Sequence, residues 1–369
     1  MKLECQTKNL KEAVQKTNKL VVKNSSLPIL NTIFIKALGK SLVLRSTNLH
    51  IGIEVEIPAN IEKEGEFIVS GEIFSKIFTT IPEKGTVSID VVENMMTIRT
   101  EKNVVSVNSS GDISDFPSLP VVEGSSFSLP LSVFLDGIKS VYYCASISDI
   151  KPEISSVFVY SDSNELVFVS TDSFRLAEKK VTVDGLPDIS GILLPYKNII
   201  EIIRLLSDIS DTEDMALFTF NENQINISLP GLFITSRIVD GMYPKYQAII
   251  PKEFKTEVVS LKNDMLDALK LSTIFSDKFN QISLSVDSQL SSCLMKAKNS
   301  QKGENVSNID TTINGESIEM NFNYKYFQEG FQSISTDSVV LQFNEENKPV
   351  VIQGVGDKSF LYLIMPMNR

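Results

Sequence analysis

The chain has 369 residues, 42% hydrophobic and 22% charged, which is typical of a folded globular protein and excludes a disordered one. This length is too great for one ordinary core and predicts several domains. The formal net charge of −11 excludes a uniformly basic surface that coats DNA phosphates, although basic residues can still gather on one face.

The first residues predict a short strand followed by a basic amphipathic helix. Residues 3–5 form the strand, and the helix covers 9–16, where Leu10, Ala13 and Val14 lie three and four positions apart. We expect Asn9 to cap this helix. The basic residues around the helix, opposed only by Glu12, are Lys8, Lys11, Lys16, Lys19 and Lys23. They form either a solvated helix face or a locally positive face on an acidic body.

Alternating polar and apolar residues predict strands through the rest of the chain. The segments are 32–37, 41–46, 86–91, 157–160, 165–170, 216–220, 224–228, 281–286 and 338–343. Short connections rich in Asn, Asp and Gly, such as 38–40 and 221–223, are typical of antiparallel hairpins. We expect sheets with one face in water, and a loop over the polar residues 298–305.

One plan recurs about every 125 residues: a strand, a polar break and an amphipathic helix. The three copies are 67–78, 191–203 and 320–331. An earlier strand and helix recur as well, at 3–16, 127–138 and 259–269, with Asn9, Ser132 and Asn263 as expected caps. Self-similarity at a fixed period indicates one structural unit used several times. We predict three tandem α+β domains, 1–122, 123–252 and 253–369, each of antiparallel sheet with about eight strands and two helices.

The residues usual in catalytic and metal sites are scarce. His50 is the single histidine, which excludes a histidine-based triad or a site with two histidine ligands. Lys40 and its neighbours lie between two predicted strands, and Phe34 stands where a phosphate-binding loop needs its first glycine. No dinucleotide-binding glycine pattern follows a strand. We therefore expect a binding protein with no catalytic residues, metal or cofactor.

The cysteines Cys5, Cys144 and Cys293 stand far apart, one in each repeat. This spacing fits neither a disulfide framework nor a zinc site, so we expect buried free thiols. No apolar run reaches 18 residues, and the amino terminus lacks the apolar core of a signal peptide. We expect a cytoplasmic protein with no membrane segment.

Five short motifs, in this order and spacing, are similar to those of the bacterial sliding clamps, the beta subunits of DNA polymerase III. They are Leu-Pro-Ile-Leu at 27–30, Asp-Phe-Pro-Ser-Leu at 115–119, Thr-Asp-Ser-Phe-Arg-Leu-Ala at 171–177, the stretch 239–246, and the terminal 362–367. The resemblance covers essentially the whole chain.

The resemblance implies two chains joined head to tail as a homodimer, a closed ring of six like domains that encircles double-stranded DNA. Helices would line the hole, and a mildly positive inner face would suffice for sliding without sequence preference. Partners would be the polymerase III catalytic subunit, the clamp loader and repair proteins, bound through short peptide motifs.

The resemblance also implies site residues. The client-peptide pocket would consist of Ile154, Thr171, Ser173, Phe174, Arg175, Leu176, Pro244, Ile249, Leu363, Met365, Pro366 and Met367. DNA-facing candidates are Lys8, Lys11, Lys16, Lys76, Lys139, Lys151, Lys197, Arg204 and Lys270. The dimer contact would join Ile274 and Phe275 to the sheet edge near Val105 and Val107.

The chain departs from the family pattern at three places. Ser173 and Phe174 replace a common Gly-His, which we expect to enlarge the apolar floor of the pocket. Asn24 and the pair Glu72 and Ile73 stand where basic residues are expected, which weakens the predicted grip of the first domain on DNA. The alternatives are a related ring of different symmetry, a clamp-like protein of repair or plasmid maintenance, a metal-dependent nucleic-acid enzyme, and a scaffold that binds no DNA.

Overall fold

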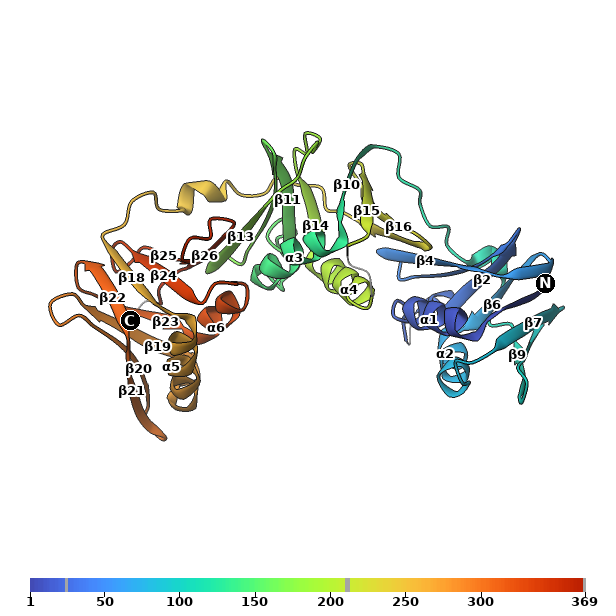
Figure 1. The fold of residues 1–369 in the computed structure, drawn as a ribbon, viewed down its shortest axis with the longest axis horizontal. Coiled ribbons are helices and arrows are strands. Elements are labelled where there is room, and N and C mark those ends of the chain that lie inside the picture. Colours follow the sequence, from blue (N-terminus) through green and yellow to red (C-terminus); the bar gives the residue numbers. More distant parts are fainter. Residues whose placement is uncertain (24–25, 210–212, 368–369) are drawn as a thin grey trace. The chain divides into compact units, whose positions relative to one another are not determined.

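The computed structural model of the protein describes residues 1–23, 26–209 and 213–367 (Figure 1). Within them the chain forms six α-helices and 26 β-strands, so the predicted α+β class is confirmed. All nine strand segments predicted from alternation lie inside observed strands. No helix in the described ranges has the length and apolarity needed to span a membrane.

The first third of the chain builds nine strands and two helices. They are β1 (Lys2–Gln6), α1 (Thr7–Asn18), the 3-10 helix η1 (Pro28–Asn31), β2 (Thr32–Leu38), β3 (Ser41–Thr47), β4 (Ile51–Pro58), β5 (Asn60–Lys63), β6 (Gly65–Ser70), α2 (Gly71–Thr80), β7 (Thr86–Val92), β8 (Met95–Arg99) and β9 (Val104–Asn108). A connection containing η2 (Ile113–Asp115) follows.

The middle and last thirds follow the same order, except that the middle third has four strands between its two helices and the others have five. The middle third has β10 (Ser125–Pro130), α3 (Leu131–Val141), η3 (Tyr142–Cys144), β11 (Ser156–Asp162), β12 (Glu165–Thr171), β13 (Arg175–Thr182), β14 (Ile192–Pro195), α4 (Tyr196–Leu206), β15 (Met215–Phe220), β16 (Gln224–Leu229), β17 (Leu232–Arg237) and η4 (Tyr246–Ile249). The last third has β18 (Thr256–Leu261), α5 (Lys262–Phe275), β19 (Gln281–Asp287), β20 (Ser292–Asn299), β21 (Gly303–Ile309), β22 (Thr311–Gly315), β23 (Ile318–Asn323), α6 (Tyr324–Gln332), β24 (Ser338–Phe343), β25 (Val350–Gly354) and β26 (Phe360–Ile364).

The first helix of each third begins where its strand ends, so the predicted caps Asn9, Ser132 and Asn263 are wrong. In each case the first helical amide donates to a main-chain carbonyl from a distant part of the chain. These hydrogen bonds run from Thr7 N to Gly85 O (3.1 Å), from Leu131 N to Asp214 O (3.0 Å) and from Lys262 N to Asp337 O (2.8 Å). A helix amide that already has a tertiary partner needs no polar capping side chain.

The loop that we expected over 298–305 is longer than the observed turn, so this prediction is also wrong. β20 runs to Asn299 and β21 starts at Gly303, which leaves a three-residue turn. The Asn299 side chain accepts hydrogen bonds from the amides of Gln301 (3.0 Å) and Lys302 (3.2 Å), and this closes the hairpin tightly. Polar composition here marks the exposed end of a hairpin.

The chain packs into two compact units, and each carries two sheets. The first unit contains 1–132 and 200–238, with sheets in the order β5-β1-β7-β8-β9 and β10-β15-β16-β17-β4-β3-β2-β6. α1 and α2 lie together in this unit (Figure 1). The second unit contains 133–199 and 239–369, with sheets β14-β11-β12-β13-β26-β25-β24-β18-β22 and β21-β20-β19-β23.

The two larger sheets each join strands from different thirds of the chain in the same way. β17 pairs antiparallel with β4, with Ile234 opposite Ile53. β26 pairs antiparallel with β13, with Tyr362 opposite Ala177. In both joins the last strand of one third pairs with the third strand after the first helix of its neighbour. The strands in the two remaining equivalent places, β9 and β21, each lie at the end of a sheet.

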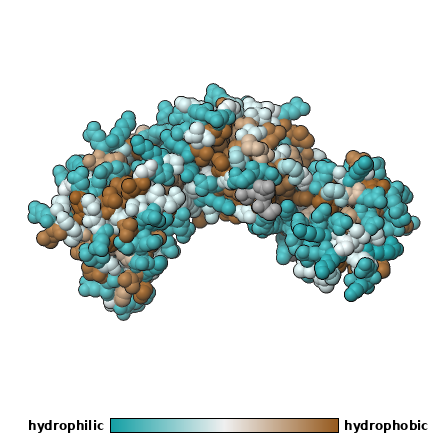
Figure 2. Space-filling view, in the orientation of Figure 1, coloured by the Kyte–Doolittle hydropathy of each residue, from teal (hydrophilic) through white to brown (hydrophobic). Residues whose placement is uncertain are grey.

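The cores of both units are apolar and closely packed. Gly330 illustrates the fit in the second unit, because a Cβ at this position of α6 would lie 2.3 Å from the ring of Tyr362. Hydrophilic residues cover much of the face drawn in Figure 2, with smaller apolar patches between them. Cys5, Cys144 and Cys293 are buried free thiols, as predicted. Burial raises the pKa of Cys5 and of Cys293 to about 12, so both thiols are protonated and unreactive at neutral pH.

Candidate functional site

A tight turn between β12 and β13 forms one wall of a cavity in the second unit. The Asp172 side chain accepts hydrogen bonds from the amides of Phe174 (2.9 Å) and Arg175 (3.0 Å). Thr171 donates its hydroxyl hydrogen to Arg175 O (2.6 Å) and accepts from the Ser173 amide (3.1 Å). Ser173 has φ +77°, so the chain reverses there in the left-handed region. The turn therefore has a fixed shape.

Arg175 fastens this turn to the last third of the chain. Its Nε donates to the Asp172 carboxylate (3.0 Å), and its guanidinium also contacts the Glu329 carboxylate on α6. Another nitrogen donates to Tyr143 O (2.6 Å), and the guanidinium carbon lies 4.6 Å from the centre of the Tyr326 ring. The Arg175 side chain is only 10% exposed. Its hydrogen-bonding groups are thus used inside the protein, as a positioning residue would use them.

The segment around η4 forms a second wall and is fixed by a buried phenol network. Tyr246 is 3% exposed, and its hydroxyl donates to the buried carboxylate of Glu178. The Tyr160 hydroxyl lies 2.8 Å from that of Tyr246. The Tyr243 ring stacks on Phe158 with the ring centres 4.8 Å apart. Burial, followed by the hydrogen bond to Glu178, raises the pKa of Tyr246, so the phenol stays protonated.

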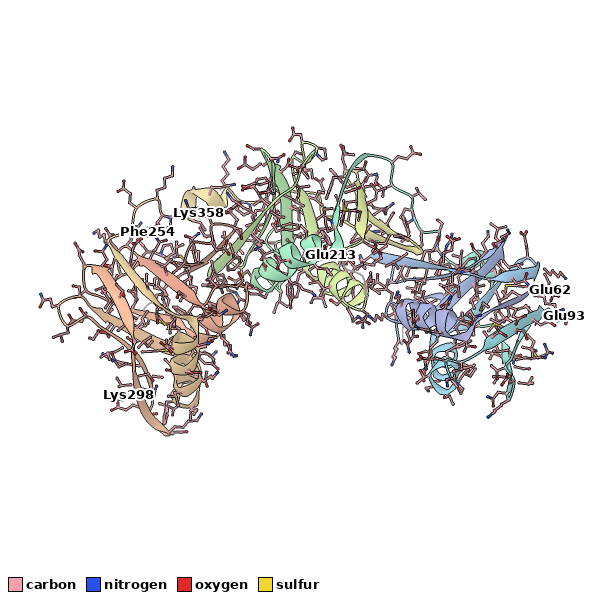
Figure 3. The ribbon with its side chains drawn as sticks, in the orientation of Figure 1. Glu62, Glu93, Glu213, Phe254, Lys298 and Lys358 are labelled. Carbon is pink, nitrogen blue, oxygen red and sulfur yellow. The ribbon has the colours of Figure 1, made fainter. Side chains whose placement is uncertain are left out.

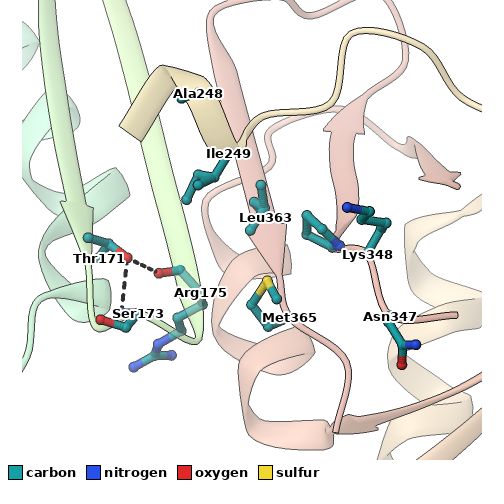
Figure 4. Close-up of a pocket in the computed structure, with 10 residues that line it drawn as sticks. Thr171, Ser173, Arg175, Ala248, Ile249, Asn347, Lys348, Leu363 and Met365 are labelled. Carbon is teal, nitrogen blue, oxygen red and sulfur yellow. Dashed lines mark hydrogen bonds between the residues drawn. The ribbon is translucent and has the colours of Figure 1, made fainter. Parts of the chain in front are cut away.

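These walls enclose a cavity of about 430 Å³ (Figure 4). Its lining residues are Thr171, Ser173, Arg175, Ala248, Ile249, Asn347, Lys348, Pro349, Leu363 and Met365. The apolar side chains of Leu363 and Met365 lie between the turn after β12 and the connection from β24 to β25, as Figure 4 shows. The arrangement suits an apolar side chain in an extended peptide, with polar groups at the mouth.

The structure brings six of the twelve expected pocket residues to this cavity: Thr171, Ser173, Arg175, Ile249, Leu363 and Met365. The other six, Ile154, Phe174, Leu176, Pro244, Pro366 and Met367, do not line it. Leu176 is fully buried in the core beneath, where it packs with Leu363 and Val351. Met367 donates its amide hydrogen to Asn321 O (2.7 Å), which directs the end of the chain toward β23.

The expectation that Phe174 enlarges the pocket floor is wrong. The Asp172 turn directs this side chain outward, and it is 61% exposed. The Phe174 carbonyl accepts a hydrogen bond from Met365 N (2.8 Å), so its main chain, and not its ring, contacts the strand end beside the cavity. The motif placed the residue in the right turn, but the direction of its side chain depended on the turn geometry.

Four lining residues were missed by sequence reasoning: Ala248, Asn347, Lys348 and Pro349. Ala248 follows Tyr246 in η4, and the other three belong to the connection between β24 and β25. The predicted strand 338–343 and the apolar run that begins at Val350 bracket this connection. The sequence therefore indicated a turn but held no signal that the turn faces Thr171.

The first third of the chain contains the same turn as the cavity wall. Asn48 accepts from the amides of His50 (3.0 Å) and Ile51 (2.8 Å), Thr47 donates its hydroxyl hydrogen to Ile51 O (2.8 Å), and Leu49 has φ +73°. The turn is therefore part of the repeated unit. His50, the single histidine, lies exposed in it.

The DNA-facing candidates lie on five helices and one connection. Lys8, Lys11 and Lys16 lie on α1, Lys76 on α2 and Lys139 on α3. Lys197 and Arg204 lie on α4, and Lys270 lies on α5. Lys151 lies in the connection that follows α3 and η3. Six of them have an acidic partner, in the pairs Lys8–Glu12, Lys11–Glu83, Lys76–Glu72, Lys197–Asp149, Arg204–Glu201 and Lys270–Asp267. In the described ranges, Lys16, Lys139 and Lys151 have none. Asn24 lies outside the described residues.

The expected dimer residues lie at the two free sheet edges. Ile274 is 55% exposed at the end of α5, and the half-buried Phe275 lies 3.6 Å from the position that a Cβ of Gly303 in β21 would take. In β9, Val105 is partly exposed and Val107 is buried against its own sheet, so only the main chain of Val107 is available. Val104 in β9 and Val306 in β21 are exposed apolar side chains on the same two strands.

Potential metal ligands do not cluster in the described part of the chain. No group of three or more His, Cys, Asp or Glu side chains in it is arranged to hold an ion.

Three family models match consecutive parts of the chain. They describe the N-terminal, central and C-terminal domains of the DNA polymerase III beta subunit and match residues 1–120, 128–245 and 247–368. The beta sliding clamps of Synechocystis and Bacillus subtilis are 24% and 26% identical, and each alignment covers 100% of this chain and at least 99% of the relative. The crystal structure of the Bacillus subtilis DNA polymerase sliding clamp superposes with a TM-score of 0.94 at 25% identity, covering 100% of this chain and 99% of that one. The chain belongs to the DNA polymerase III beta-subunit family.

Proposed function

We propose that this chain forms a head-to-tail homodimeric ring that encircles duplex DNA in the cytoplasm and tethers the replicative polymerase. As a member of its family the chain is a sliding clamp of DNA replication, a processivity factor that is not itself catalytic. The domain boundaries that we propose for it are 1–122, 123–252 and 253–369. The contacts, the path of DNA and the client pocket below belong to the proposal.

The repeated strand join carries the ring proposal. Each join within the chain pairs the last strand of one third with the third strand after the first helix of another, as in β17 with β4 and β26 with β13. β9 is the last strand of the first third, and β21 is the third strand after the first helix of the last third. Each of these two strands has a paired neighbour on one side only. Pairing of β9 with β21 of a second chain would repeat the same join twice and leave neither strand as an edge.

The chemistry of these edges supports this pairing. Exposed edge strands usually carry Lys or Pro, which block pairing with another chain. β9 reads Val-Val-Ser-Val-Asn and β21 reads Gly-Glu-Asn-Val-Ser-Asn-Ile, so neither contains either residue. The apolar residues Ile274, Val104 and Val306 stand exposed at the same edges. A second copy of the chain is therefore the partner that we propose for them.

Encirclement explains how an acidic protein stays on DNA. Direct binding to phosphates needs many basic residues and fails at high salt, whereas a closed ring is held by topology. Lys16 on α1, Lys139 on α3 and Lys151 in the connection after η3 have no acidic partner among the described residues, and they give the proposed inner face a modest positive charge. Contacts to phosphate alone carry no sequence preference, which a sliding protein requires.

The cavity behind the Thr171 turn is the proposed client site. Its six expected residues would hold the apolar part of a short peptide from the polymerase, the clamp loader or a repair protein. Met365 suits several clients, because its unbranched side chain adapts to differently shaped apolar groups.

Retention on circular DNA tests the ring. The protein is loaded on a nicked circular plasmid with its clamp loader and ATP, washed at high salt, and the plasmid is then cut once. We expect the protein to stay on the circle and to leave after the cut. A control without the loader shows whether retention needs active loading. Retention that persists on the linear DNA would contradict encirclement, because it would mean that the protein grips DNA directly.

A further inference from the structure

The first unit has a cavity of its own, at the strand join between β4 and β17. It lies between the turn after β3, the connection from η2 to β10, and the strands β16 and β17, and its volume is about 240 Å³. The turn is the one that the first third shares with the middle third. The contact at the end of the join is shared too, because Arg237 N donates to His50 O (2.9 Å) as Met365 N donates to Phe174 O. The cavity therefore belongs to the repeated architecture.

The floor of this cavity lacks the leucines of the client cavity. Gly52 follows the turn as Leu176 does, and it stands opposite Thr235 in the join, where Leu176 stands opposite Leu363. The Leu119 side chain, from the connection after η2, lies where a Cβ of Gly52 would stand. The chain thus supplies one leucine from its own connection, and the rest of the floor is left small and polar.

The lining of the cavity includes a cation and no carboxylate. Arg237 stands two residues after Thr235 and is exposed, and the His50 side chain is exposed on the turn. Among the described residues no Asp or Glu lines the cavity, and Glu62 and Glu93 of the same unit lie elsewhere (Figure 3). A guanidinium presents paired N–H donors that match the two oxygens of a carboxylate. The charge of the lining therefore suits an acidic ligand.

Thr235 adds a polar group that the fold does not use. It is 4% exposed, and its hydroxyl has no hydrogen-bond partner among the described residues. The Thr47 hydroxyl, also in the lining, donates to Ile51 O and accepts from the Leu49 amide. A buried hydroxyl without a partner costs free energy, and native structures rarely leave one so. A ligand that accepts a hydrogen bond from Thr235 would remove this cost.

We propose that this cavity is a second ligand site, which takes the Asp or Glu side chain of a short peptide. The carboxylate accepts hydrogen bonds from Arg237 and Thr235, and an apolar neighbour in the peptide packs on Leu49 and Leu119. The cavity is smaller than the usual site for a drug-sized ligand, so one side chain suits it. The inference goes beyond the client site and does not depend on it.

Methyl NMR of the full chain, with labelled leucine methyl groups, separates the two sites. Leu49 and Leu119 report on this cavity, and Leu363 reports on the client cavity. The probes are two capped dipeptides, acetyl-Leu-Asp-amide and acetyl-Leu-Asn-amide, which differ only in the charge of one side chain. Each is titrated into the protein until the signals stop shifting.

Three variants are titrated beside the native chain. Arg237→Gln removes the charge of the lining, and Thr235→Val removes the hydroxyl while it keeps the shape of the side chain. Arg99→Gln is the matched control, because Arg99 is an exposed arginine of β8 in the same unit and does not line the cavity.

We expect the Asp dipeptide to shift the Leu49 and Leu119 signals saturably and to bind about two- to five-fold more tightly than the Asn dipeptide, the range of an exposed ion pair. The preference should vanish in Arg237→Gln and persist in Arg99→Gln. Thr235→Val should bind the Asp dipeptide more weakly and lose no stability, because the hydroxyl that it lacks had no partner in the free protein.

The absence of saturable shifts at Leu49 and Leu119 would overturn the inference. Shifts confined to Leu363 would also overturn it, because they would place the peptide in the client cavity alone. Unchanged binding and preference in both Arg237→Gln and Thr235→Val would show that the cavity is not the site. The Leu363 signals report on the client cavity separately, so a failure here leaves the proposed function standing.

Discussion

Arg175 shows how one residue of the family motif acts through its partners. It lies 10% exposed between Asp172, the Tyr143 carbonyl and Glu329, so it links the pocket turn to α6. Removing the Arg175 guanidinium would leave the Asp172 carboxylate partly buried and without a cation. A buried charge that loses its partner destabilises the folded protein. The pocket therefore owes its shape to an ion pair below its surface.

The substitution Arg175→Met tests this positioning role. We expect the free energy of unfolding to fall by about 3–5 kcal/mol, as when one partner of a buried pair is removed. Urea denaturation measures the loss. The matched control is Glu329→Gln, which removes a partner that is 41% exposed and should cost less than about 1 kcal/mol. Equal losses in the two variants would contradict the central role of Arg175.

At the scale of elements, the free strands β9 and β21 and the end of α5 form the proposed contact between chains. Ile274 offers a clean test, because its side chain is 55% exposed and contributes little to the core. We expect Ile274→Ala to weaken the dimer by about 1.5–3 kcal/mol at each of the two contacts, the value of burying such a side chain.

Sedimentation at nanomolar concentration should then report monomers for Ile274→Ala and dimers for the native chain. The control is Leu290→Ala, since Leu290 is also an exposed apolar residue of the last third but lies in the connection between β19 and β20. A dimer mass for Ile274→Ala under these conditions would count against this edge as the contact.

For the whole molecule, two separate effects hold the protein on DNA in our proposal: topology and a weak positive face. Replacing Lys16, Lys139 and Lys151 by alanine should weaken direct, salt-sensitive binding to linear duplex and lower its salt dependence by about 0.9 for each phosphate that is no longer neutralised. Retention on circular plasmid should remain. The measurement is binding to linear DNA over a salt series. The control replaces Lys40, Lys102 and Lys358 by alanine, because these exposed lysines are not among the DNA-facing candidates. Equally weakened binding in both triple variants would show that Lys16, Lys139 and Lys151 contribute no more to DNA binding than other exposed lysines.

Local pattern predicted the six helices and many of the strands, because alternation and helical spacing are properties of neighbouring residues, but it took the hairpin of β20 and β21 for a loop. It was insufficient for the helix caps: the partners of Thr7, Leu131 and Lys262 are carbonyls from distant segments. The same reason explains the pocket. Motifs within one stretch, such as 171–175 and 362–365, were recognised, but Lys348 reaches the cavity only because β26 pairs with β13 and β25 with β26.

The sequence by itself determined the repeated α+β unit, its strands and helices, and the family, because these depend on periodicity and on short ordered motifs. Only the tertiary structure decided which strands from different thirds pair, which two edges stay open, that Arg175 is used internally, and that Phe174 points outward. Each of these depends on contacts between residues far apart in the chain, and a side chain's neighbours across a strand join cannot be read from its neighbours in sequence.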